Sequence, residues 1–274
     1  MFLPDRRNIL TRKRYKWLPK RHKRLYSKLV RLARAAFAKQ ILRMSNNDLR
    51  EKLSMAMDGV VAALPPTEPS ERMSFCRHGE NRMWRKPCES FSPKLSGDTD
   101  CGNQVPLERV VPMRGGCSAD GLSVITFHAK KKLNAEEWAK AVTRGVLVTA
   151  IKALKLGLMN GTWHVLCYSE SFLRAAVSSA AQRNAKVMLW KMPAKSPDLN
   201  PVKRFWSWLR KKLRAVDLQG AVAKRPVLGK IAYKARVRAV CRSKQAQRVA
   251  ANHEKLMKRV CHQVVLKKGA ATGF

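Results

Sequence analysis

The order of strand and helix patterns between residues 52 and 214 restricts this chain to few folds. The mostly apolar segment KLSMAMDGVVAAL, at 52–64, predicts a buried strand that carries Asp58. RVVPMRGGCS and LSVITFHA, joined by the turn ADG, predict a hairpin. Two short apolar segments, WHVLCY at 163–168 and AKVMLW at 185–190, predict further strands.

Helical patterns follow the hairpin and each of these last two strands. Asn134 with Glu137 three residues later is typical of a capping box, and the pattern predicts a helix to about Leu154. Ser169 is expected to cap a second helix over 170–183. The resulting order, strand, hairpin, helix, strand, helix, strand, helix, indicates a mixed α/β layer fold with antiparallel strands at the front and parallel strands at the back.

The segment SPDLNPVKRFW, at 196–206, predicts a turn followed by a third helix that runs to about Arg214. Asn200 is a good N-cap and Pro201 suits the first helical position. Lys203 is out of place, because the helix dipole favours an anion in the first turn and a Glu there would complete a capping box. The apolar residues of this helix form one stripe, which we expect to be buried: Val202, Phe205, Trp206, Leu209 and Leu213.

The charge of the chain is extreme and is concentrated at its two ends. The sequence has 57 Lys and Arg against 18 Asp and Glu, which gives a net charge of +39. Residues 1–50 hold 16 basic and 2 acidic side chains, and residues 203–274 hold 20 basic and 2 acidic ones. Clustered Lys and Arg neutralise phosphates well, so the composition favours a nucleic-acid partner, most of all duplex DNA, over an anionic membrane.

The residues expected to contact nucleic acid come from both basic ends. The N-terminal cluster TRKRYKWLPKRHKR could also direct the protein to the nucleus, which is the expected location. No apolar run of eighteen residues and no signal-type segment is present, so we expect an intracellular protein that does not span a membrane. The candidate contact residues are Arg12, Lys13, Arg14, Lys20, Arg21, Lys23, Arg24, Lys203, Arg210, Lys211, Lys212, Arg214, Lys234, Arg236 and Arg238.

The pattern along the chain predicts three parts. Residues 1–50 are expected to form a basic helical arm, since apolar residues recur at helical spacing within 11–44. Residues 51–215 hold the α/β domain, in which the Pro-, Gly-, Ser- and Cys-rich stretch 66–108 is expected to be an irregular insertion. Residues 216–274 are expected to form a basic helical extension.

The seven cysteines indicate no metal centre. They include no CxxC pair, and Cys76 and His78 with Cys88 and Cys101 fit no usual zinc spacing. Reduced, unligated thiols are the expectation.

Two motifs resemble a known enzyme family. SPDLNPVKRFWSWLRKKL is similar to the motif that ends the catalytic domain of mariner-superfamily transposases, SPDLNPIE followed by an aromatic, Leu-rich helix. MWRKPCE, at 83–89, resembles the WRKPGE stretch of the same enzymes. The resemblance covers roughly residues 50–215 and implies an RNase H-like fold, a mixed sheet flanked by helices. It also implies DDE chemistry, in which two Asp and one Glu hold two divalent ions at a phosphodiester.

The family's three carboxylates map onto this chain with only one retained. Asp58 stands at the first Asp position. The Glu falls at Lys203, and the family spacing places the second Asp at Tyr168, at the end of a strand. A rival alignment places it at Met159, because MNGTWH resembles the DN-x-x-x-H pattern of these enzymes. In either alignment the second Asp is missing, so we expect no metal cofactor. If the protein is nevertheless active, the expected cofactor is Mg²⁺ or Mn²⁺.

Two other carboxylates are candidates to replace the missing ones. Glu170 follows Tyr168 by two residues, and Asp198 precedes Lys203 by five. Both have local explanations, Glu170 at a helix N-terminus and Asp198 in a turn. Asp58 itself is interpretable as a polar residue left in an unused cleft.

Three functional hypotheses follow. The favoured one is a transposase-derived nucleic-acid-binding protein that no longer cleaves DNA. The second is an active metal-dependent DDE endonuclease or transposase with displaced carboxylates, and the third is a basic RNA-bound structural protein. The family's N-terminal helix-turn-helix domains do not fit into the stretch before Asp58, so sequence-specific recognition in the family's manner is not expected. A homodimer is one assembly that the sequence leaves open.

Overall fold

A computed structural model describes residues 16–19, 26–53, 55–78, 82–85, 107–129, 133–153, 158–159, 161–168 and 170–272. The chain divides into two compact units. The larger unit comprises residues 26–64, 107–213 and 228–274, and the smaller one comprises 1–25, 65–106 and 214–227. The larger unit contains the α/β fold, and each unit is described by itself.

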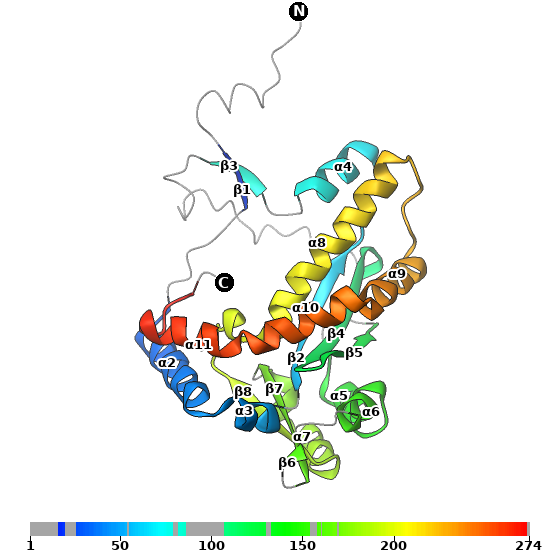
Figure 1. Ribbon diagram of the computed structural model, residues 1–274. Coiled ribbons are helices and arrows are strands. Elements are labelled where there is room, and N and C mark those ends of the chain that lie inside the picture. Colours follow the sequence, from blue (N-terminus) through cyan, green and yellow to red (C-terminus); the bar gives the residue numbers. More distant parts are fainter. Residues whose placement is uncertain are drawn as a thin grey trace, which may run out of the picture. The chain divides into compact units, whose positions relative to one another are not determined.

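The larger unit is built on a mixed sheet of six strands (Figure 1). The strands are β2 (Met55–Ala63), β4 (Val110–Ser118), β5 (Gly121–Phe127), β6 (Leu158–Met159), β7 (Thr162–Tyr168) and β8 (Val187–Met192). The order is β5-β4-β2-β7-β6, with β8 on the other side of β7. The β2–β4 and β4–β5 pairs are antiparallel, whereas β2–β7 and β7–β8 are parallel. The predicted antiparallel front and parallel back are therefore confirmed.

Helices cover both faces of this sheet. One hydrophobic cluster joins strand residues to α2, α3 and α8–α11, and a second joins the alternate strand residues to α5–α7. Ala56 belongs to the first cluster and its neighbours Met55 and Met57 to the second, as the two-residue period of a strand requires. No described helix combines the length and apolar character needed to cross a bilayer. The helices of the larger unit are α2 (Lys28–Arg43), α3 (Asn46–Lys52), α5 (Ala135–Thr143), α6 (Val146–Lys152), α7 (Ala176–Asn184), α8 (Pro201–Val222), α9 (Lys230–Arg242), α10 (Lys244–Lys255) and α11 (Met257–Leu266).

Two predicted helices differ from those observed. The helix expected from Asn134 to Leu154 begins with the predicted capping box. It divides into α5 and α6, because Arg144 ends the first helix and Gly145 precedes the second. The helix expected over 170–183 is replaced by a 3₁₀ turn, η4 (Ser171–Arg174), followed by α7. In both segments short helices pack separately on the sheet, which a single periodicity does not reveal.

The smaller unit corrects three further expectations. Residues 16–19, expected to be helical, form strand β1 (Lys16–Pro19), which pairs with β3 (Arg82–Arg85). The stretch 66–108, expected to be irregular, contains β3 and the helix α4 (Pro69–His78). Helix α8 continues eight residues past the expected end at Arg214, and its last part belongs to this unit. The Arg72 guanidinium donates to the Arg225 carbonyl at 2.6 Å within the unit.

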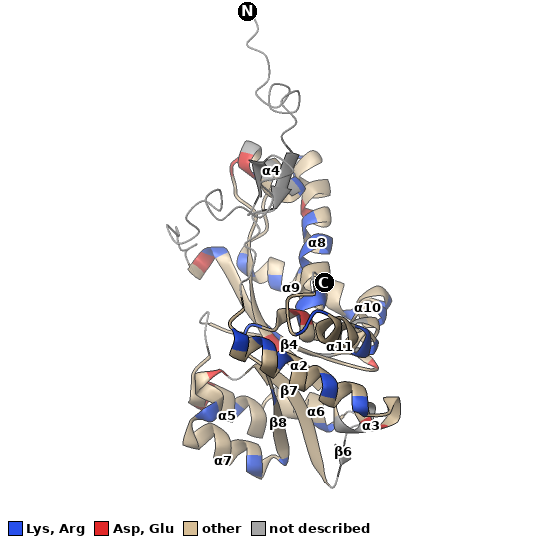
Figure 2. Cartoon of the chain, turned by 90° about the vertical axis from the view of Figure 1, so that its left-hand side faces the viewer, with Lys and Arg blue, Asp and Glu red and all other residues tan. Residues whose placement is uncertain are grey.

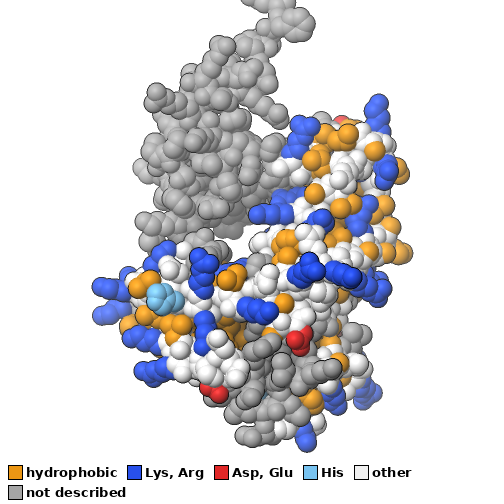
Figure 3. Space-filling view, viewed as in Figure 1, with side chains coloured by type: hydrophobic (Ala, Val, Ile, Leu, Met, Phe, Trp, Pro, Cys, Tyr) orange, Lys and Arg blue, Asp and Glu red, His pale blue; other side chains and the backbone are white. Residues whose placement is uncertain are grey.

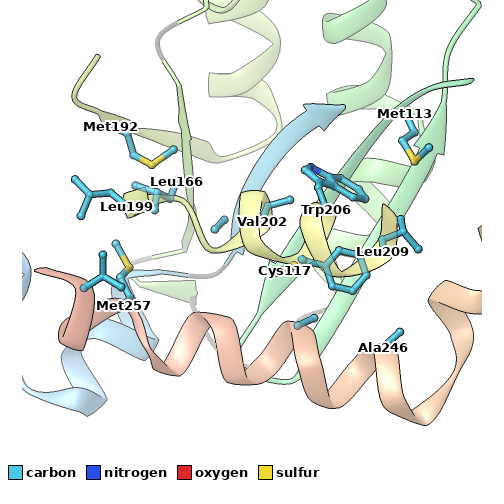
Figure 4. Close-up of a cluster of buried hydrophobic side chains, with 14 of the residues drawn as sticks. Met113, Cys117, Leu166, Met192, Leu199, Val202, Trp206, Leu209, Ala246 and Met257 are labelled. Atoms are coloured by element: carbon cyan, nitrogen blue, oxygen red, sulfur yellow. The ribbon is translucent and has the colours of Figure 1, made fainter. Parts of the chain in front are cut away.

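The first part of α8 lies in the centre of the larger hydrophobic cluster. Its predicted apolar stripe is buried throughout, and Figure 4 shows Val202, Trp206 and Leu209 between the strands and α10–α11. Gly115 of β4 makes this packing possible, because a Cβ atom there would lie 2.6 Å from the Trp206 ring. The close approach positions the N-terminus of α8 against the sheet.

A buried ion pair ties two distant segments, α2 and the residues after α11, to the turn before α8. Arg34 of α2 donates to both carboxylate oxygens of Asp198, at 2.8 and 2.7 Å, in the 3₁₀ turn η5 (Pro197–Leu199). The Arg34 side chain also donates to the carbonyls of Gly269 and Ala270, and Thr272 donates twice to Asp198. Asp198 is thus held by long-range contacts, not by the local turn chemistry that the sequence suggested.

The pKa of Asp198 reflects these contacts. Burial alone would raise it, but the hydrogen bonds and the charge of Arg34, together with Thr272, bring the pKa below its ordinary value of 3.8. A lowered pKa in the folded state means that the ionised carboxylate stabilises the fold above that value. The stabilisation is lost as the pH falls through the lowered pKa.

Asp198→Asn should therefore lower the free energy of unfolding by about 3–5 kcal/mol at neutral pH, because Arg34 would be left as an uncompensated buried charge. Urea unfolding followed by circular dichroism measures the loss, which should shrink at pH values below 4. Asp120→Asn, at an exposed position in the β4–β5 turn, is the matched control and should change stability by less than about 0.5 kcal/mol. Equal stability of the two variants would contradict the role of the pair.

Candidate functional site

Three elements of the larger unit bring the sequence-predicted site residues together. Asp58 lies on the central strand β2, and Tyr168 is the last residue of the neighbouring parallel strand β7. Lys203 lies in the first turn of α8. Asp58 has the same strand parity as Ala56, so its side chain is on the face of the sheet that α8 covers.

The centre of the site is an ion pair between two of these residues. The Lys203 ammonium is 2.6 Å from Oδ2 of Asp58. It also lies 5.5 Å from the centroid of the Tyr168 ring, within the range of a cation–π contact. The Asp58 side chain is 6% exposed and that of Lys203 is 36% exposed, so the pair has a buried acid and a half-buried base.

Two further donors hold the Asp58 carboxylate. The backbone N–H of Gly59 donates to Oδ1 at 2.7 Å, and Nδ2 of Asn200 donates to Oδ2 at 3.4 Å. The side-chain oxygen of Asn200 meanwhile accepts from the backbone N–H of Val202 at 3.2 Å. The predicted helix cap is therefore also a direct contact of the acid, which the sequence motif alone did not reveal.

Burial dominates the pKa of Asp58. Removal from water raises the pKa of this carboxyl above its ordinary value, while Lys203, the Gly59 N–H and the charge of Arg114 act in the opposite direction. A raised pKa means that ionisation of Asp58 costs folding free energy, and Lys203 reduces that cost.

Beside the ion pair lies a cavity of about 530 Å³, lined by Asp58, Tyr168, Arg114, Glu170 and His128 among others. Arg114 of β4 donates one guanidinium nitrogen to both carboxylate oxygens of Glu170, at 3.1 and 2.9 Å. Sequence reasoning missed Arg114, although a single charged residue within the apolar strand VVPMRGGCS was a usable signal.

Aromatic rings and a histidine surround Arg114. Its guanidinium carbon lies 5.3 Å from the Phe172 ring centroid and 5.8 Å from that of Trp138. Burial lowers the pKa of His128, and the nearby charge of Arg114 lowers it further. The cavity wall therefore carries the paired charges of Arg114 and Glu170, together with a histidine whose lowered pKa favours the neutral form.

Neither candidate replacement carboxylate is available to a metal. Glu170 lies at the N-cap position of η4, as expected, but its side chain makes no capping bond and instead forms an ion pair with Arg114. Asp198 is occupied by Arg34 and Thr272. The rival position Met159 lies in β6, which pairs with the beginning of β7, whereas Tyr168 ends that strand.

Divalent ions do not fit the residues present here. Among the described residues no group of three His, Cys, Asp or Glu side chains is arranged to hold a metal. Oδ2 of Asp58 already contacts an ammonium, and a second cation at that oxygen would meet direct repulsion. The five described cysteines are free and buried, and burial raises the pKa of Cys167 to about 12.

The structure describes only some of the residues that are predicted to contact nucleic acid. Arg210, Lys211 and Lys212 are exposed on α8, and the blue segments of the ribbon in Figure 2 mark Lys and Arg positions along this helix and α10–α11. On α9, the charged groups of Lys234 and Arg238 lie 5.8 and 4.7 Å from the Phe127 ring. Arg236 is half-buried on α9, and Arg214 is half-buried on the part of α8 in the smaller unit. The N-terminal candidates lie outside the described residues: Arg12, Lys13, Arg14, Lys20, Arg21, Lys23 and Arg24.

Comparisons with known proteins agree with this geometry. Residues 121–220 match the family model described as DDE superfamily endonuclease. This segment, a little over a third of the chain, is therefore similar to that superfamily. No curated protein matches the chain by sequence. The match confirms the predicted resemblance to DDE enzymes, and the solved structures described next bear on the fold.

Solved structures of Mos1 mariner transposase show the same RNase H-like fold. Its catalytic domain with Raltegravir and Mn aligns with a TM-score of 0.59 at 9% identity, over 90% of this chain and 98% of that chain. The catalytic domain alone aligns with a TM-score of 0.59 at 10% identity, over 93% and 99%. A pre-cleavage Mos1 transpososome aligns with a TM-score of 0.61 at 11% identity, over 93% of this chain and 66% of that chain. The predicted fold class is confirmed.

Replacing Lys203 by Met should raise the pKa of Asp58 further and reduce stability at pH 7 by about 1–3 kcal/mol, a range that allows for the partial exposure of Lys203. Stability falls as the pH rises through the pKa of Asp58, and this fall should be larger in the variant. Below that pKa the protonated acid needs no cation, so the two proteins should converge. Chemical unfolding from pH 3 to 8 measures this.

The control for this prediction is Lys212→Met, an exposed lysine on the same helix. Asp58→Asn combined with Lys203→Met should recover part of the loss, because no buried charge is then left unpaired. Parallel stability curves for the wild type and Lys203→Met would show that the ion pair is not formed in solution.

Proposed function

We propose that this chain is a transposase-derived nucleic-acid-binding protein in which an internal ion pair has replaced the metal-dependent site. The observation that carries the proposal is the 2.6 Å contact between the Lys203 ammonium and Asp58. A DDE site places three carboxylates around two dications, whereas here the retained acid is neutralised by a side chain of the same protein. Strand cleavage through this site is therefore not expected.

Two observations support binding to nucleic acid: the net charge of the chain and the similarity of its fold to that of Mos1 transposase. The net charge is +39, and the described helices α8–α11 carry many of its exposed cations. Mos1 transposase, which shares the fold, has been solved as a paired-end complex with the left transposon end. We infer that duplex DNA is the main partner, that phosphate contacts provide most of the affinity, and that the protein acts in the nucleus. A homodimer remains a prediction.

The alternative of an active endonuclease with displaced carboxylates is less well supported. It would need Glu170 or Asp198 to join Asp58 at a metal. Each of these acids is held by an arginine at 2.9 Å or less, and releasing it would leave that buried arginine unpaired. The cost opposes recruitment of either acid.

Purified protein should not nick supercoiled DNA in the presence of Mg²⁺ or Mn²⁺. Gel electrophoresis of the plasmid after incubation measures this, and Asp58→Asn is the matched variant. Titration with Mn²⁺ followed by electron paramagnetic resonance should show no tight site in the wild type, since ammonium and dication compete for one oxygen. Metal-dependent nicking that Asp58→Asn or Glu170→Gln abolishes would establish the active-enzyme alternative instead.

Affinity for duplex DNA should fall steeply with salt, because binding releases counterions from phosphates. Fluorescence anisotropy at several salt concentrations gives the slope of log affinity against log salt. Changing Lys211 and Lys212 together to Gln should reduce that slope by about one to two. The control pair Lys140→Gln and Lys152→Gln, exposed on α5 and α6, should leave it nearly unchanged. A flat salt dependence in the wild type would contradict nucleic-acid binding.

A further inference from the structure

A basic groove lies along the face of α8 that turns toward α10 and α11. It has a volume of about 700 Å³. Five cations line it, Lys203, Arg204, Arg210 and Lys211 from α8 and Arg259 from α11, and the described lining includes no carboxylate. Lys and Arg side chains predominate over acidic ones on the face that Figure 3 shows.

The remaining lining of the groove is apolar and aromatic. Trp208 of α8 is half-buried there, opposite valine and leucine side chains from the α10–α11 segment. The Trp208 ring packs 5.6 Å from Phe205, centroid to centroid, so it is supported from the hydrophobic core. An aromatic ring held among cations is the combination that binds bases and phosphates of an unpaired strand.

We propose that this groove binds a short single-stranded segment of nucleic acid, with a base stacked on Trp208 and the flanking phosphates on the exposed cations Arg210, Lys211 and Arg259. The proposal rests on the nucleic-acid binding proposed above and adds a second, base-dependent site to it. A duplex presents its phosphates outward while its bases are stacked on one another, so it would contact the cations and leave the ring and apolar lining unused. An unpaired strand can use both.

The dimensions of the groove agree with such an occupant. A volume of about 700 Å³ lies within the range of pockets that hold small ligands, which is enough for one or two nucleotides. The charge favours an anionic partner, because the lining carries several cations and its described residues include no carboxylate. Lys203 lines the groove and also contacts Asp58, so the groove adjoins the Asp58 ion pair.

The test measures base-dependent binding at Trp208. Fluorescence anisotropy would compare an oligo(dT) strand of about 12 nucleotides, an abasic strand of equal length and charge, and a duplex of that length. The wild type should bind oligo(dT) roughly tenfold more tightly than the abasic strand, as expected for one stacked base. A ribose strand, oligo(U), included as a further arm, distinguishes RNA from DNA as the source of the unpaired strand.

Two variants of Trp208 separate stacking from folding. Trp208→Leu keeps an apolar side chain but removes the ring, and it should lose the roughly tenfold preference while binding the abasic strand and the duplex as before. Trp208→Phe should retain most of the preference. Thermal unfolding would show whether both variants are folded. If Trp208→Leu does not fold, the affinities of the wild type and Trp208→Phe for oligo(dT) and the abasic strand still test the preference for a base.

A matched pair of cation variants tests the phosphate contacts. Arg259→Gln, in the groove, should weaken oligo(dT) binding, whereas Arg183→Gln, exposed on α7, should not. Equal affinity for oligo(dT) and abasic strands would overturn the groove proposal but leave general nucleic-acid binding intact. Absence of binding to every nucleic acid would instead overturn the proposed function. An acidic peptide, poly-Glu, that binds tightly and needs Trp208 would identify a protein partner and contradict the proposal.

Discussion

The position of the site depends on the buried Arg34–Asp198 ion pair. Arg34 is fully buried and its five N–H groups are directed at Asp198 and at three backbone carbonyls, so its charge is matched by acceptors on every side. The pair joins α2, the η5 turn and the residues after α11, which are more than 160 positions from Arg34 along the chain. Because η5 leads directly into α8, this interaction determines where the first turn of α8, and with it Lys203, meets the sheet.

Once α8 is in this place, the electrostatics of the site follow from the ion pair between Lys203 and Asp58. Three ionised acids at one point repel one another and require metal ions, so a DDE site without metal stores unfavourable charge. In this chain the charge of Asp58 is balanced by Lys203, and the ammonium also contacts the Tyr168 ring; the sequence motif predicts that Tyr168 and Lys203 stand at two of the three carboxylate positions. Arg114 and Glu170 balance each other in the same way beside the cavity. The fold can therefore persist without an ion at its centre.

Sequence reasoning predicted the parts of this arrangement that local patterns encode. The strands, the Asn134 capping box and the stripe of α8 follow from periodicity and capping chemistry, which act over a few residues. The division of the helix at Gly145 and the strand β1 depend on packing partners far along the chain, and periodicity does not carry that information. The same limit explains why Asp198 was interpreted as a turn residue and why Arg114 was missed, since each has a partner more than 50 positions away.

Lys203 was conspicuous in the sequence because a helix N-terminus disfavours a cation, and the structure shows what offsets that cost. The dipole penalty at a half-exposed first turn is at most about 1 kcal/mol, while a buried carboxylate without a counter-charge costs several. The contact with Asp58 is therefore the larger effect. It needs both partners, Asp58 as well as Lys203. Retention of the first acid is then evidence for the ion pair as readily as for metal chemistry. The pH dependence of stability in variants at position 203 distinguishes the ion pair from metal chemistry as the reason for the acid.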